Sequence, residues 1–207
     1  MKTRTSAAGT ASIVNGLVRF LGELGVNVRM SSPVSEIVVK NGRATGVVTE
    51  GGELFEADVV VANADPTMVY QRMIDPRWRK RHTTSSLARK KQSMSLFVAY
   101  FGTDRLYPDV KHHTIVLGPR YRELLTDIFK RKHLAHDFSL YLHRPTASDP
   151  DLAPPGRESF YVLSPVPNNE SGLDWETLGP QYLERVYSEL ERRCLPGLRR
   201  HLTTSFY

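Results

Sequence analysis

Seven histidines offer the most versatile chemistry in this sequence, because an imidazole can bind a metal ion or move a proton near neutral pH. His112 and His113 are neighbours, so on a strand their side chains would point to opposite faces and could not hold one ion together. His133 and His136 could share a helical face, but no acidic residue accompanies them at a recognisable ligand spacing. We therefore predict no metal site.

Nucleophilic and phosphate-binding chemistry also lack a sequence signal. The single thiol, Cys194, falls at the C-terminal end of a predicted helix, where the helix dipole does not activate it, so a small buried apolar role fits it better. No Gly-x-Ser-x-Gly elbow is present. Gly22-x-x-Gly25 and Gly51-Gly52 lack the Gly-x-Gly-x-x-Gly spacing of a phosphate loop. This argues against a self-sufficient dinucleotide-binding domain.

The elements that must position the remaining side chains belong to a chain of ordinary globular composition. Its 207 residues are 40% hydrophobic and 24% charged, which is typical of a folded, soluble protein. Apolar runs such as residues 59–62 are far shorter than the ~20 residues of a membrane-spanning helix. The first residues lack the apolar core of a signal peptide. We expect a cytoplasmic protein.

The first part of the chain predicts a helix, an antiparallel meander and a buried strand. Apolar residues at helical spacing place the helix at 12–24. Three strands follow at 34–40, 44–49 and 54–57, and Asn41-Gly42 is the strongest short hairpin signal because both turn positions need positive φ. The continuous β-branched run at 58–62 predicts a strand buried on both faces.

The second part predicts strands interleaved with helices. A short basic helical region is predicted at about 67–91. After it come two strands at 93–102 and 113–117, a helix at 121–129, two further strands at 137–143 and 159–165, and a helix at 174–194. The fold class is therefore α/β with mixed α+β character. We place the domain boundary at residue 70, giving domains 1–70 and 71–207.

The basic charge of the chain is confined to the second domain. Residues 1–70 hold six Lys and Arg against seven Asp and Glu, whereas residues 71–207 hold 22 against 15. The stretch 72–91 is the densest, with eight basic residues and one acid. Such a stretch suits an anionic surface or is simply solvated. Nucleic-acid recognition motifs are missing, so we predict no nucleic-acid partner.

Several segments resemble the bacterial and fungal type of phytoene desaturase, a family of FAD-dependent enzymes of carotenoid synthesis. The most specific are 95–102 (SLFVAYFG), 112–123 (HHTIVLGPRYRE), 137–145 (DFSLYLHRP), 160–167 (FYVLSPVP) and 195–199 (LPGLR). Segments between residues 9 and 65 resemble flavin-dependent desaturases and amine oxidases more broadly. The chain lacks both the initial Gly-x-Gly-x-x-Gly turn and the second glycine-rich flavin segment, so it resembles the middle of such an enzyme.

The resemblance implies that residues 1–70 form part of a Rossmann-like FAD-binding domain. In relatives the backbone at the position of Val34 hydrogen-bonds the adenine, and the turn matching Ala62, Asn63 and Ala64 lies near the cofactor. FAD is the implied cofactor. Because the pyrophosphate-binding turn is missing, we expect the chain alone to hold FAD weakly and to be inactive.

Residues 71–207 would then form the substrate-binding domain, with a mixed sheet. The implied reaction is dehydrogenation of a long polyene hydrocarbon such as phytoene, with hydride passing to the flavin. A hydrocarbon is recognised by apolar burial alone, so aromatic residues on the strands are the candidate lining: Phe97, Tyr100, Phe138 and Tyr141. No catalytic residue can be named.

A lipid-dissolved substrate implies a protein peripheral to the membrane. Arg79, Lys80 and Arg81 in the basic stretch are the candidate contacts with an anionic membrane surface. Two alternatives remain open. One is another flavin-dependent, amine-oxidase-like oxidoreductase that shares only residues 9–66 with the desaturases, and the other is a non-catalytic basic binding module.

Overall fold

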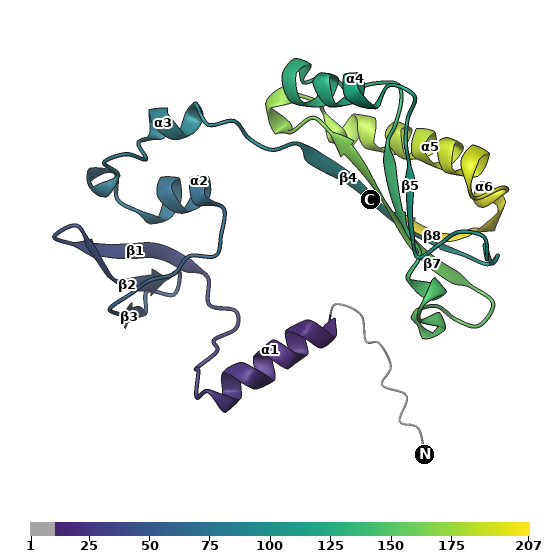
Figure 1. Cartoon of the computed structure of the whole chain (residues 1–207). Coiled ribbons are helices and arrows are strands. Elements are labelled where there is room, and N and C mark those ends of the chain that lie inside the picture. Colours follow the sequence, from purple (N-terminus) through teal and green to yellow (C-terminus); the bar gives the residue numbers. More distant parts are fainter. Residues whose placement is uncertain (1–10) are drawn as a thin grey trace. The chain divides into compact units, whose positions relative to one another are not determined.

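The computed structural model describes residues 11–207, which divide into two units (Figure 1). We call residues 11–91 the meander unit and residues 92–207 the sheet unit. The division falls between Lys91 and Gln92, beyond the boundary at residue 70 that the sequence suggests. Val69 and Leu87 are buried within the meander unit, so the basic helical stretch packs with the strands that precede it. The assignment of cofactor and substrate domains stays a prediction.

The meander unit consists of a helix, a three-stranded sheet and a series of short helical turns. In chain order its elements are α1 (Ala11–Glu23), β1 (Val34–Lys40), β2 (Arg43–Thr49), β3 (Leu54–Glu56), α2 (Pro66–Met68), the π-helix η1 (Val69–Met73), the 3₁₀ turn η2 (Pro76–Trp78) and α3 (Thr84–Ala88). The strands pair antiparallel in the order β1-β2-β3.

The hairpin that the sequence predicts is confirmed. Lys40 pairs with Arg43, so Asn41 and Gly42 are the two residues of the turn. Their φ angles are 52° and 79°, which is the left-handed region that such a turn requires. A short polar residue and a glycine reach this region at little steric cost. The local sequence therefore determines the register of β1 on β2.

The strand predicted at residues 58–62 is wrong. The segment has no regular secondary structure and forms no ladder, and Val59 and Val61 are 73% and 87% exposed. A strand buried on both faces needs neighbouring strands and a covering layer, and no strand among residues 11–207 pairs with this one. The β-branched run thus has the composition of an interior strand, but within residues 11–207 it has no neighbouring strands.

Helix α1 likewise has the sequence pattern of a packed element without buried side chains. Its position agrees with the prediction, and Gly25 beyond its end has φ of 72°. No residue of α1 is buried. Its apolar stripe, including Ile13, Leu17 and Phe20, is more than half exposed. The amphipathic pattern fixed the helix, but not a partner for its apolar side.

The sheet unit contains five antiparallel strands in the order β5-β6-β7-β4-β8. Its elements are β4 (Ser95–Thr103), β5 (His113–Val116), α4 (Tyr121–Thr126), the π-helix η3 (Asp127–Arg131), β6 (Leu140–His143), the 3₁₀ turns η4 (Pro145–Ala147) and η5 (Pro150–Leu152), β7 (Glu158–Val166), the 3₁₀ turn η6 (Asn169–Ser171), α5 (Trp175–Arg193), α6 (Leu198–His201) and β8 (Leu202–Phe206). The predicted α/β fold class with mixed α+β character is confirmed. Strand β8 is an addition, because the patterns in the sequence predict no strand at residues 202–206.

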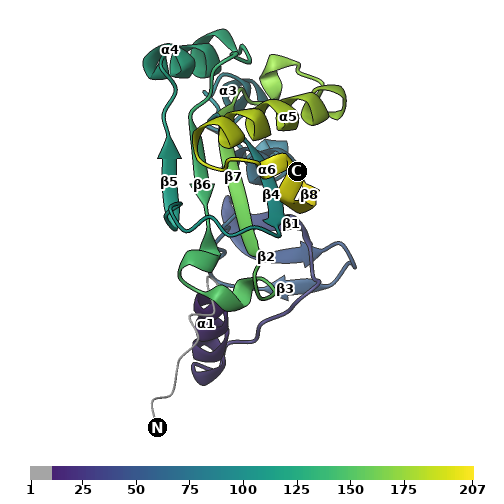
Figure 2. The same ribbon diagram turned by 90° about the vertical axis from the view of Figure 1, so that its right-hand side faces the viewer.

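The core of this unit lies between the sheet and α5, which crosses one face of it (Figure 2). Asp174 caps the start of α5 by accepting hydrogen bonds from the backbone N–H groups of Glu176 and Thr177. Helical spacing then aims a buried stripe at the strands: Tyr182, Val186, Tyr187 and Leu190. The ring of Phe101 stacks on Phe160 at 5.1 Å and meets Tyr187 edge-on at 5.4 Å.

Removing one leucine from this core should destabilise the chain. Leu190 is fully buried, so Leu190→Ala should lower the free energy of unfolding by about 3 kcal/mol through lost burial and a cavity. The matched control is Leu152→Ala, at a leucine that is half exposed, and it should cost less than about 0.5 kcal/mol. Urea unfolding followed by circular dichroism measures both values. Equal losses would contradict a core centred on α5.

Candidate functional site

Alternate residues of the five-stranded sheet form an apolar face on the side opposite α5. In β4 the even-numbered positions are the more exposed ones, whereas the odd-numbered positions are buried, and β7 shows the same alternation with odd positions outward. We call the outward side the open face; its side chains include Leu96, Val98, Tyr100, His113, Ile115, Tyr141, His143, Tyr161, Leu163 and Phe206. A solvated sheet face is usually polar, so an apolar open face is unusual and makes this side of the sheet the candidate site.

Rings on the open face form a continuous row across all five strands. Phe206 on β8 stacks on Tyr100 on β4 at 5.0 Å, and Tyr100 lies 5.7 Å from Tyr161 on β7. Tyr161 in turn lies 4.5 Å from His143 on β6, and His143 stacks on His113 on β5 at 5.2 Å. Spanning five strands gives the row a length of about 19 Å. The row is therefore an extended aromatic strip of low polarity.

The four predicted lining residues divide between the two faces of the sheet. Tyr100 and Tyr141 lie on the open face. Phe97 is buried on the other face, where its ring lies 4.9 Å from Tyr182 of α5. Phe138 precedes β6 and also packs against Tyr182, at 5.4 Å. Sequence reasoning missed His143, whereas it counted Tyr161 among the aromatic strand residues that suit such a wall without selecting it as a lining residue.

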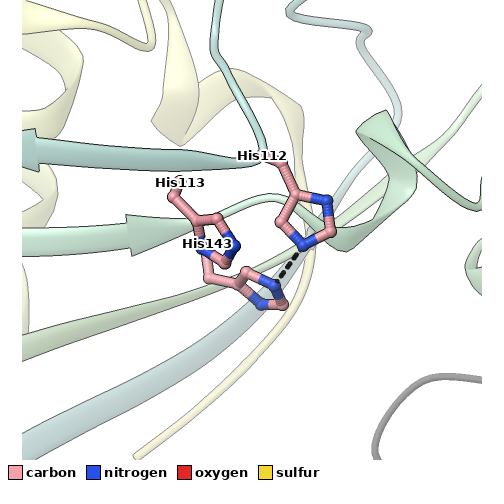
Figure 3. Close-up of side chains that lie close together, drawn as sticks. All are labelled: His112, His113 and His143. Atoms are coloured by element: carbon pink, nitrogen blue, oxygen red, sulfur yellow. Dashed lines mark hydrogen bonds between the residues drawn. The ribbon is translucent and has the colours of Figure 1, made fainter.

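Three histidines gather at one end of the row (Figure 3). The prediction that His112 and His113 cannot approach one site is wrong, since their rings lie 4.4 Å apart. Strand β5 begins at His113, and His112 lies in the bend before it, so strand alternation does not govern His112. His143 on β6 is the direct partner of His113 in the ladder and completes the group.

The surroundings of this group favour neutral side chains. Burial lowers the pKa of His143, and the neighbouring His112 and His113 lower it further, because a second or third positive ring would be repelled. Burial also raises the pKa of Tyr161, and its hydrogen bond with Tyr141 acts in the same direction. At neutral pH the rings of His143 and Tyr161 are therefore uncharged, in keeping with an apolar surface.

A buried ion pair fixes this corner of the sheet. The Arg144 guanidinium donates from Nε to Glu158 Oε1 at 2.7 Å, and the other oxygen, Oε2, accepts from the backbone N–H of Tyr107 at 2.9 Å. Arg144 also donates to the carbonyl of Val110, and its backbone N–H donates to the carbonyl of His112 at 2.9 Å. The segment leading into β5 is thereby tied to β6 and β7. Sequence reasoning gave no role to either partner of the pair.

The residues predicted to hold a cofactor lie in the meander unit. Ala62 and Ala64 line an apolar pocket of about 260 Å³, together with residues such as Ile37, Val60 and Tyr70. Asn63 is exposed between them, and Val34 lies half-buried at the start of β1, paired with Thr49. The lining of the pocket is almost entirely apolar. It offers no cationic side chain and no glycine-rich turn for a pyrophosphate.

The basic stretch is less uniform than its sequence. Arg79 is only 9% exposed, and its guanidinium donates to the backbone carbonyls of Ile74 at 2.7 Å and Gln71 at 2.9 Å. Arg79 thus stabilises the fold of the segment, which removes it from a membrane-facing role. Lys80 and Arg81 are exposed.

Two remaining sequence predictions concern the thiol and membrane spans. Cys194 is partly buried against the core, and burial raises its pKa to about 11, so the thiol stays protonated and unreactive at neutral pH. Within residues 11–207, none of the helices combines the length and the apolar character needed to cross a bilayer.

Comparison with known proteins connects this geometry to a family. The family model described as flavin containing amine oxidoreductase matches residues 2–204. The chain is 44% identical over 197 residues to a lycopene-forming phytoene desaturase of Pseudescherichia vulneris, covering 95% of this chain and 40% of the relative. It is 42% identical over 201 residues to a neurosporene-forming phytoene desaturase of Rhodobacter capsulatus, covering 94% and 38%. The resemblance to phytoene desaturases is confirmed, and the chain spans about two fifths of their length.

Among solved structures, an oxidoreductase from Methanosarcina mazei superposes with a TM-score of 0.66 at 17% identity. The match covers 96% of this chain and 42% of that one. At this identity the likeness concerns the fold alone. It extends through both units, so each has a counterpart in a larger oxidoreductase.

Breaking the buried pair should unfold the corner that it holds. Arg144→Met leaves the Glu158 carboxylate buried and unpaired, so stability should fall by about 3–5 kcal/mol. The double variant Arg144→Met/Glu158→Gln removes the charge while keeping an acceptor for Tyr107, and it should recover at least half of that loss. Urea unfolding measures both.

The matched control is Arg192→Met, at an exposed arginine paired with Glu189, which should cost less than about 1 kcal/mol. If Arg144→Met is as mild as this control, the pair does not fix the corner.

Proposed function

The chain belongs to the flavin-containing amine oxidoreductase family, and we propose that it contributes the substrate-binding sheet of an enzyme that dehydrogenates a long polyene hydrocarbon such as phytoene. The observation that carries the proposal is the aromatic row across the open face, in a segment similar to phytoene desaturases. The sheet would form one wall of the hydrocarbon site.

The physics of hydrocarbon recognition supports this assignment. A polyene has no hydrogen-bonding groups, so binding comes from burial at about 0.8 kcal/mol per CH₂ and from contact with flat rings. Side chains such as Leu96, Ile115 and Tyr100 present exposed apolar area on the same side of the sheet. An extended ligand of many carbons would make a strong total contact from individually weak ones.

The same surface argues against the alternative of an amine substrate. A cationic amine needs a carboxylate or a cage of rings around the charge. None of the side chains on the open face is a carboxylate; its titratable groups are His113, His143, Tyr100, Tyr141 and Tyr161. A non-catalytic basic module would in turn have no use for an apolar sheet.

We infer that FAD is the cofactor of the complete enzyme, as the family implies a flavin. When bound, the flavin accepts the hydride while a proton leaves the adjacent carbon and a C=C bond forms. In this chain the pocket at Ala62 and Ala64 would hold a flat apolar part of the cofactor, and the backbone of Val34 would meet its adenine. The isolated chain should bind FAD weakly, since its sequence holds no Gly-x-Gly-x-x-Gly turn that could cradle the pyrophosphate.

Exposed basic residues of the meander unit would hold the protein at an anionic lipid surface, close to its substrate. Lys80 and Arg81 carry this proposal, whereas Arg79 does not because its guanidinium is occupied. Each basic side chain near an anionic bilayer contributes about 1 kcal/mol. The contact is peripheral.

A chimera tests the proposed function. Residues of this chain would replace the corresponding 197-residue segment of the Pseudescherichia vulneris phytoene desaturase, and we expect the product to retain flavin and to desaturate phytoene. Tyr100→Glu in the chimera should lower the rate at least tenfold, because a carboxylate would be buried against hydrocarbon. Extracted carotenoids, separated by chromatography, measure conversion.

The control for the chimera is Tyr121→Glu on α4, at a tyrosine of similar exposure (47% against 43% for Tyr100) that lies off the open face. It should leave the rate within about twofold. An active chimera in which both tyrosine variants behave alike would contradict the role of the open face.

Lipid binding is tested separately with the 207-residue chain. Lys80→Glu/Arg81→Glu should weaken co-sedimentation with phosphatidylserine-containing vesicles by roughly 30-fold, from two contacts of about 1 kcal/mol each. High salt should have a similar effect on the unmodified chain. The equal charge change Arg122→Glu/Lys130→Glu, at exposed positions in the sheet unit, should have a smaller effect. Equal losses would mean that only net charge matters.

A further inference from the structure

The histidine group at the end of the open face has the composition of a metal centre. His112, His113 and His143 each offer a ring nitrogen, and these three atoms lie within 4.8 Å of one another. Figure 3 shows the rings converging, with Nε2 of His112 and Nε2 of His143 only 2.7 Å apart. Two nitrogens bound to one tetrahedral zinc are about 3.3 Å apart, given Zn–N distances of 2.0–2.1 Å. Small ring rotations would therefore bring all three onto one ion.

The backbone holds the three side chains in place from two segments. His113 and His143 are direct partners in the β5–β6 ladder, and the carbonyl of His112 accepts the backbone N–H of Arg144. The buried Arg144–Glu158 pair lies at the same corner. The ligands thus stand on a supported scaffold rather than on a free loop, as metal sites require.

In two of the three histidines a second ring nitrogen has a hydrogen-bonding contact, as is usual for metal-binding histidines. His112 Nδ1 lies 2.5 Å from Ser148 Oγ, and His113 Nδ1 lies 2.6 Å from the hydroxyl of Tyr141. Such contacts set the tautomer of a ring. They leave Nε2 of His112 directed at Nε2 of His143 and leave Nε2 of His113 available for an ion. Nδ1 of His143 is buried without a hydrogen-bond partner in the described part of the chain. The group is therefore not a closed hydrogen-bond network.

We propose that His112, His113 and His143 bind one divalent transition-metal ion, with Zn²⁺ or Co²⁺ as representative ions. Three imidazoles without a carboxylate suit borderline ions of this class and not Mg²⁺ or Ca²⁺, which prefer oxygen ligands. His113 is exposed, which provides an entry path, and a fourth position stays open to water. The ion would clip the edge strand β5 to β6. This inference is independent of the proposed reaction.

Calorimetric titration of the 207-residue chain with Zn²⁺ tests the site. We expect one saturable ion per chain, and Co²⁺ should give the visible absorption bands of a low-symmetry nitrogen site. His112→Gln and His143→Gln should each weaken binding at least 100-fold. The matched control His136→Gln, at an exposed histidine of the same unit outside the group, should change the affinity less than threefold.

A milder variant guards against misfolding of the ligand variants. Ser148→Ala removes the hydrogen-bond partner of His112 at an exposed position and should weaken Zn²⁺ binding about tenfold. Circular dichroism verifies the fold of each variant. The proposal is overturned if the unmodified chain shows no saturable binding below about 1 mM. It is equally overturned if folded His112→Gln and His143→Gln variants bind like the control.

Discussion

One-sided burial of the five-stranded sheet is the constraint on which the rest of the sheet unit depends. Helix α5 covers one face, where rings and branched side chains such as Phe101, Phe160 and Val186 exclude water. Because side chains alternate strictly along a strand, the register that builds this core also determines every residue of the open face. A slip of one residue in β4 would exchange the two. The pairing of β4 with β7 therefore determines both which side chains form the core and which form the open face.

The corner at Arg144 and Glu158 shows how the sheet holds its functional edge. Their side chains are 12% and 2% exposed, and each partner has further hydrogen bonds to the segment before β5. A buried pair of this kind contributes little net stability, because desolvation offsets the attraction. Its value lies in geometry, since only one arrangement satisfies all the groups. That arrangement brings the backbone of His112 beside β6 and makes a cluster of three histidines out of two distant segments.

The meander unit differs, because several of its segments have the apolar sequence pattern of buried elements although their side chains are exposed. Helix α1 has no buried residue, and Val59 and Val61 are exposed in a segment that has an interior composition. A helix of 13 residues is marginal when only local terms stabilise it, and an unpaired β-branched run has no ladder to fix it. Both features are those of elements that draw their stability from packing.

The sequence by itself determined what depends on neighbours along the chain. The position of α1, the Asn41-Gly42 hairpin, most strands of the sheet unit and α5 follow from periodicity, turn chemistry and helix-end signals, each acting within a few residues. Family membership also followed, since specific segments such as 112–123 carry it without reference to structure.

Tertiary structure alone decided what depends on pairing between segments. Phe97 was assigned to the core and Tyr161 to the open face by the strand order, and residues 58–62 stayed unpaired despite their composition. His112 lies beside His113 and His143 because β5 begins only at His113. If β5 included His112, strand alternation would place the side chains of His112 and His113 on opposite faces. Local patterns indicate which residues are apolar enough to be buried, but the register of the paired β-strands determines which residues they contact.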